Sequence, residues 1–118
     1  MLLSDKQAAF SDALVRFLAA NRAIEVDGAI YRYRLDYLHR SAEENARLHA
    51  HPKSTHIYRL AADILLDKSL DGGVTWEWVD SRDDPAWSIM HQRWEDYGGS
   101  PMIQDDPGHF SFEHNGVR

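Results

Sequence analysis

The N-terminal third of the chain shows a helical pattern of apolar residues, an extended pattern, and then a second helical start. Residues 4–20 carry apolar side chains at helical spacing, and Ser4-x-x-Gln7 forms a capping box that would begin this helix. Residues 24–33 contain Asp27-Gly28 among β-branched and aromatic residues, which predicts a turn and a short strand. Ser41-x-x-Glu44 is a second capping box, so we expect a short helix through about His49 that Pro52 ends.

The C-terminal half favours strands on either side of one helix. Residues 60–66 form an apolar run interrupted only by Asp63, which predicts a buried strand with a single charge. A glycine turn at residues 71–73 separates it from a predicted partner strand over residues 74–79. Asp84-Pro85 is a typical helix start, and Gly98-Gly99 would end that helix. Alternation over residues 109–113 predicts a last strand.

These elements predict an α+β protein. The chain has 118 residues, 43% of them hydrophobic, which suits one domain with one core. We therefore expect a single compact domain over residues 1–118, with N-terminal helices packed on a small antiparallel sheet. We expect no second domain.

Composition narrows the classes of partner. The formal net charge is −6 and no basic run occurs, which disfavours nucleic acid as a partner. No apolar run approaches the roughly 20 residues of a membrane helix. The N-terminus lacks a basic segment followed by a long apolar stretch, so we expect no signal peptide and synthesis in the cytoplasm. Cysteine is absent, so a transition metal must be held by His, Asp or Glu.

The carboxylate in the apolar strand points to a metal site. A buried Asp63 needs a cation or hydrogen-bond donors as a partner. His56 lies seven residues earlier and His109 in a later strand, and two His with one carboxylate leave a fourth tetrahedral position open, as in catalytic zinc sites. Asp106 could then act as a general base. The same residues also permit plainer interpretations: Asp63 paired with an arginine, surface or core histidines, and an ordinary turn at residues 105–108.

The combined motifs resemble those of the zinc D-Ala-D-Ala carboxypeptidase and L-alanyl-D-glutamate endopeptidase family, which includes phage endolysins. Ser54, His56, Ala61 and Asp63 match its Ser-x-His-x-x-Gly-x-Ala-x-Asp pattern, and Asp-x-x-His-Phe follows at residues 106–110. Residues 39–45, His-Arg-Ser-Ala-Glu-Glu-Asn, are similar to a family segment that begins a helix. The match covers roughly residues 37–113 and fails at Arg59, where the family usually has glycine.

The resemblance implies a role for each matched residue. His56, Asp63 and His109 would bind one zinc ion, and Asp106 would be the general base. Arg40 would bind a substrate carboxylate or the oxyanion; its alternative is a surface ion pair with Asp36 or Glu44.

Two further residues are expected to bind substrate. Ser54 would hydrogen-bond the substrate or support a ligand, its alternative being a plain turn hydroxyl. Arg59 implies a changed loop, which would narrow the cleft, add a cation near substrate carboxylates, or mark a degenerate site.

The function implied is cleavage of the peptidoglycan stem peptide, with the bond between L-alanine and D-glutamate as first expectation. A D-Ala-D-Ala carboxypeptidase or dipeptidase is the alternative enzyme. An inactive zinc-binding module, such as a phage structural or interaction protein, is the alternative outside catalysis. An enzyme of this type would reach the wall after release from the cytoplasm, for example through a phage holin. We expect no separate cell-wall-binding domain beside the peptidase domain.

Overall fold

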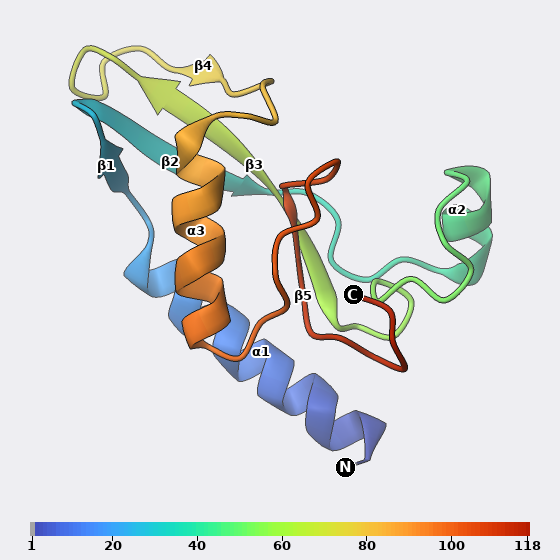
Figure 1. The fold of residues 1–118 in the computed structure, drawn as a ribbon. Coiled ribbons are helices and arrows are strands. Elements are labelled where there is room, and N and C mark those ends of the chain that lie inside the picture. The colour runs from blue at the N-terminus through green and yellow to red at the C-terminus, as the bar shows by residue number, and fades with distance from the viewer. Residues whose placement is uncertain (1) are drawn as a thin grey trace.

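Three helices and five strands follow one another along residues 2–118, the part of the chain that the computed structural model describes (Figure 1). The order is α1 (Leu3–Ala20), β1 (Ile24–Val26), β2 (Ala29–Leu35), α2 (Ala42–Arg47), β3 (Ala61–Ser69), β4 (Glu77–Trp78), α3 (Pro85–Asp96) and β5 (His109–Ser111). The predicted α+β class is confirmed. No helix within these residues is long and apolar enough to cross a membrane.

All strand pairs are antiparallel, and β3 is the strand on which the sheet is built. The order β1-β2-β3-β4 forms the main sheet, and β5 pairs with the first residues of β3. The strand predicted over residues 60–66 is present but runs to Ser69, whereas β4 has only two of the six residues expected and β5 ends at Ser111. Residues 24–35 form a hairpin of two strands, because Asp27 and Gly28 both take positive φ angles (52° and 81°), as a two-residue type I′ turn requires.

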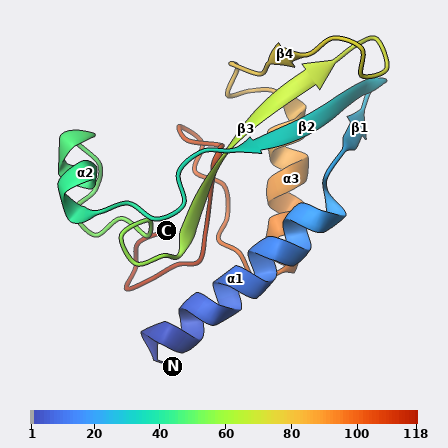
Figure 2. The same cartoon turned by 180° about the vertical axis from the view of Figure 1, so that it is seen from behind.

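The core joins the sheet to α1 and α3. Phe17 of α1 and Trp94 of α3 are buried with ring centroids 5.3 Å apart, and Leu66 and Phe110 from the sheet belong to the same cluster. In contrast, α2 stands apart from both other helices (Figures 1 and 2). Of the N-terminal helices expected to pack on the sheet, α1 contributes to the core, whereas α2 does not. Its only buried residue is polar, Asn45.

The helix starts follow the sequence signals in two of three cases. The Ser41 hydroxyl accepts from the Glu44 N–H at 3.1 Å, and the Asp84 carboxylate accepts from the Ala86 N–H at 3.0 Å. The predicted capping box of α1 does not form: Leu2 is the N-cap residue, without a side-chain cap. The Gln7 amide instead donates to the Tyr58 carbonyl at 2.8 Å and ties α1 to the turn before β3.

Candidate metal centre

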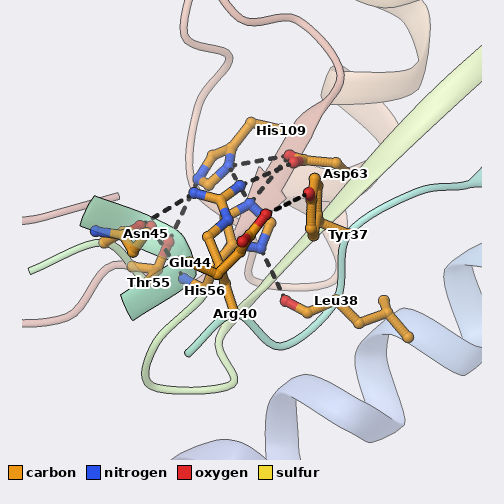
Figure 3. A network of polar contacts seen from close by, with 10 residues as sticks. Tyr37, Leu38, Arg40, Glu44, Asn45, Thr55, His56, Asp63 and His109 are labelled. Atoms are coloured by element: carbon orange, nitrogen blue, oxygen red, sulfur yellow. Dashed lines mark hydrogen bonds and ion pairs between the residues drawn. The ribbon is translucent and has the colours of Figure 1, made fainter. Parts of the chain in front are cut away.

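Three segments bring the predicted ligands together. Asp63 on β3 lies directly opposite His109 on β5 in the strand register, and His56 lies in the turn that leads into β3. The Asp63 Oδ1 atom is 3.1 Å from His56 Nε2 and 3.4 Å from His109 Nδ1. The two imidazole nitrogens are 3.2 Å apart, so the three atoms form a nearly equilateral triangle (Figure 3).

The size of this triangle fits a tetrahedral metal ion. Nitrogen and oxygen ligands about 2.0–2.2 Å from zinc at tetrahedral angles lie roughly 3.3–3.6 Å from one another. The observed edges of 3.1–3.4 Å are close to that spacing. Three lone pairs that converge on one point repel each other unless protons or a cation lie between them. His56, Asp63 and His109 therefore form a group that could hold a metal ion.

The second nitrogen of each imidazole is also engaged. His56 Nδ1 donates to the Leu38 carbonyl at 2.8 Å, because a carbonyl oxygen can only accept. His109 Nε2 lies 3.3 Å from the Thr55 hydroxyl. With these nitrogens protonated, His56 Nε2 and His109 Nδ1 keep their lone pairs for the centre of the triangle. Both rings are buried; the Leu38 carbonyl sets the tautomer of His56, whereas the Thr55 hydroxyl can either donate to His109 Nε2 or accept from it.

Asp63 is ionised at neutral pH. Burial raises the pKa of Asp63, but the contacts with His109 and His56 outweigh it and lower the pKa to about 2. An arginine partner is also present, since Arg40 Nη2 lies 3.4 Å from Asp63 Oδ2. Oδ2 of Asp63 therefore pairs with an arginine, as the plainer interpretation expects, while Oδ1 faces the two histidines, as the metal-site prediction expects.

Arg40 is buried and contacts the oxygen of Asp63 that faces away from the two histidines. Only 8% of it is exposed, its Nη1 donates to Asn45 Oδ1 at 3.1 Å, and its Cζ lies 4.9 Å from the centre of the Tyr37 ring. The predicted alternative, a surface ion pair with Asp36 or Glu44, is wrong, because the guanidinium turns inward toward the carboxylate of β3. Glu44 pairs with Arg47 instead.

Ser54 and Arg59 shape the turn that carries His56. The buried Ser54 hydroxyl accepts from the His56 N–H at 3.3 Å, so it contacts a candidate ligand residue directly. Arg59 is exposed and takes a left-handed φ of 57°. The Arg59 N–H bonds to the His56 carbonyl and the Leu60 N–H to the Thr55 carbonyl, which is the Schellman pattern with Arg59 at the position glycine favours.

A cleft of about 200 Å³ adjoins the triangle. Asp63 and Asp106 both line it, together with Trp78 and Trp87. Within residues 2–118 no hydrogen bond or ion pair engages the Asp106 carboxylate. Partial burial of this carboxyl group, and then the negative charge of Asp63, raise the pKa of Asp106. A free carboxylate with a raised pKa beside the candidate ligands can accept a proton.

Two residues that we did not predict hold the segment between Asp106 and His109. The His91 imidazole donates to the Pro107 carbonyl at 2.6 Å and stacks on Phe110, with ring centroids 3.9 Å apart. A Cβ atom on Gly108 would lie only 2.6 Å from the Ile64 carbonyl oxygen, so no larger residue fits between this turn and β3. Gly108 was visible in the sequence as part of a turn; nothing in the sequence marked His91 among seven histidines.

The site is thus built from residues 38–63 on one side and residues 91–109 on the other. All three predicted ligands and Asp106 come together, and Arg40 supports Asp63. Comparison with known proteins adds no family assignment to this geometry: no protein-family model, no curated protein and no solved structure matches the chain.

Proposed function

We propose that the protein is a zinc hydrolase that cuts a peptide bond in the peptidoglycan stem peptide, with the bond between L-alanine and D-glutamate as first candidate. The observation that carries the proposal is the triangle of His56, Asp63 and His109 beside a cleft that also contains Asp106. The substrate is taken from the sequence resemblance, which covers the ligands, Asp106 and the Arg40 segment.

A zinc ion held by the three ligands would polarise the scissile carbonyl and activate water for attack. The remaining tasks fall to residues of this chain. Asp106 accepts a proton from the attacking water and passes it to the nitrogen of the departing amine, so the peptide bond yields a carboxylate and an amine. Its raised pKa suits both transfers, because a stronger base takes the proton more readily and still releases it to an amine.

Arg40 contributes positive charge rather than a two-pronged clamp in this proposal. Both of its terminal nitrogens already have partners, Asn45 and Asp63. Its charge stabilises the negative charge that develops next to Asp63 during attack. Ser54 positions the backbone of His56 by accepting its N–H. The exposed side chain of Arg59 does not line the cleft, so it contacts only parts of the substrate that lie outside the cleft.

The test combines metal analysis with mass spectrometry of peptidoglycan fragments. We expect one zinc per chain and new amino-terminal D-glutamate. Asp106→Asn should keep zinc and lose at least about 10²-fold in turnover, the usual contribution of general acid–base catalysis. The matched control is Asp105→Asn, which changes the neighbouring carboxylate, 96% exposed, and should leave turnover unchanged.

Each other outcome has a distinct meaning. Near-normal turnover by zinc-loaded Asp106→Asn would show that another group is the base. Release of D-alanine in place of D-glutamate termini would indicate a carboxypeptidase. Stoichiometric zinc without any cleavage would favour the inactive binding module.

A further inference from the structure

The segment before β3 attaches to the rest of the protein through polar side chains. Between residues 36 and 59, all buried residues are polar or charged: Arg40, Asn45, Ser54, Thr55 and His56. In both views α2 lies away from α1 and α3 (Figures 1 and 2). The end of the segment is closer to them, because Tyr58 packs against the core and its carbonyl accepts a hydrogen bond from Gln7 of α1. The position of α2 therefore depends on specific hydrogen bonds more than on apolar packing.

Asn45 is the most buried residue of α2, with 2% of its surface exposed. Its Oδ1 accepts from Arg40 Nη1 at 3.1 Å, and its Nδ2 donates to the His51 carbonyl at 2.7 Å. The amide therefore links Arg40 to the chain that returns from α2 toward His56. Figure 3 shows Asn45 on the far side of the guanidinium from Asp63.

The orientation of Arg40 rests on few contacts. Its Nε is buried without a hydrogen-bond partner, and its bond to Asp63 Oδ2 is long, at 3.4 Å. Asn45 thus makes the shortest polar contact to the guanidinium. Arg40 in turn holds one oxygen of Asp63, which leaves Oδ1 facing His56 and His109. Because the terminal torsion of aspartate is soft, the ligand carboxylate needs such a partner to keep one orientation.

We infer that Asn45 is a positioning residue of the metal site: it fixes Arg40, and Arg40 orients the ligand carboxylate of Asp63. The inference rests on the zinc site of the proposed function but not on its peptide substrate. It predicts that Asn45 affects zinc binding although two residues, Arg40 and Asp63, stand between it and the site of the ion.

Zinc affinity of the full chain, measured by competition with a chromophoric chelator, tests this directly. Asn45→Leu should weaken zinc binding about 10-fold, the lower end of the usual effect of outer-shell partners. In an Arg40→Met background the same substitution should change the affinity little, because its intermediary is gone. Glu44→Gln, one residue earlier on α2, keeps an acceptor for Tyr37 and should bind zinc as the parent does.

Zinc affinity unchanged in Asn45→Leu, or an equal loss with and without Arg40, would overturn the inference, since a purely structural role needs no arginine. If Asn45→Leu does not fold, Asn45→Ser removes the same two contacts with a smaller side chain and gives the same comparison. A parent protein that binds no zinc would defeat both this inference and the proposed function. A parent that binds zinc but cleaves no peptidoglycan would defeat the proposed function alone.

Discussion

Replacing Arg59 with glycine should stabilise the protein, because the chain already holds a glycine-like conformation there. Arg59 has a φ of 57° and closes the turn from Thr55 to Leu60 through two backbone hydrogen bonds. A residue with a Cβ atom is strained in this left-handed region, whereas glycine is not. The side chain of Arg59 is exposed and forms no hydrogen bond or ion pair within residues 2–118, so its loss removes no such contact.

The size of the effect follows from two opposing terms. Left-handed backbone costs a residue with a Cβ atom about 1–2 kcal/mol. Glycine loses about 0.5–1 kcal/mol more backbone entropy on folding than alanine does. The difference is a gain of roughly 0.5–1 kcal/mol in the free energy of unfolding. For a chain of 118 residues this gain should raise the Tm by about 2–4 °C.

Urea unfolding and calorimetry of three proteins give the measurement. Arg59→Ala is the matched control, because it removes the guanidinium but keeps the Cβ atom and hence the strain. We expect Arg59→Gly to be more stable than the parent and Arg59→Ala to be close to it. Equal stability of the glycine and alanine variants would refute the reasoning, since the backbone would then carry no strain at this position.

Two further substitutions test the support of the segment from Asp106 to His109. Gly108→Ala should lower the free energy of unfolding by about 2–3 kcal/mol and weaken zinc binding, because the new Cβ would press on the Ile64 carbonyl. Urea titration and a zinc-affinity measurement check this, and parent-like values for both would show that the turn can shift. Burial lowers the pKa of His91 to about 4. Between about pH 6.5 and pH 4 the imidazole is therefore protonated in the unfolded chain but neutral in the folded chain, and the free energy of unfolding falls as the pH falls. His91→Gln, which keeps a donor for the Pro107 carbonyl, should therefore lose about 2 kcal/mol less than the parent between pH 7 and pH 5; equal losses would contradict it.

Local signals in the sequence predicted local structure well. Asp84-Pro85 begins α3, and its periodic Trp87, Met90 and Trp94 are all buried. The apolar run around Asp63 is the central strand. These features depend on residues within a few positions of one another, so hydrophobic spacing and capping suffice. Even so, Ser4 failed as a cap, because α1 already begins at Leu3.

The support of the site could not be predicted, because its contacts join distant residues. His56 bonds to the carbonyl of Leu38, 18 residues earlier, and His91 to that of Pro107, 16 residues later. Carbonyl groups occur at every position and leave no mark in the sequence. The sequence motif predicted that His56, Asp63 and His109 lie together. The orientation of Arg40 toward Asp63 could not be predicted, because it depends on where α2 lies relative to β3.

The two halves of the candidate centre are held by different forces. Asp63 and His109 lie on paired strands whose inner faces belong to the apolar core, so they stay fixed relative to each other. His56 and Arg40 belong to residues 36–59, in which every buried residue is polar or charged, and hydrogen bonds supply most of the contacts that join this polar segment to β3. A cation bound by all three ligands would tie this segment to β3 and β5, and its binding energy would add to the stability of the fold there. Binding of a cation should therefore slow the exchange of amide hydrogens with solvent more in this polar segment than in β3 or β5.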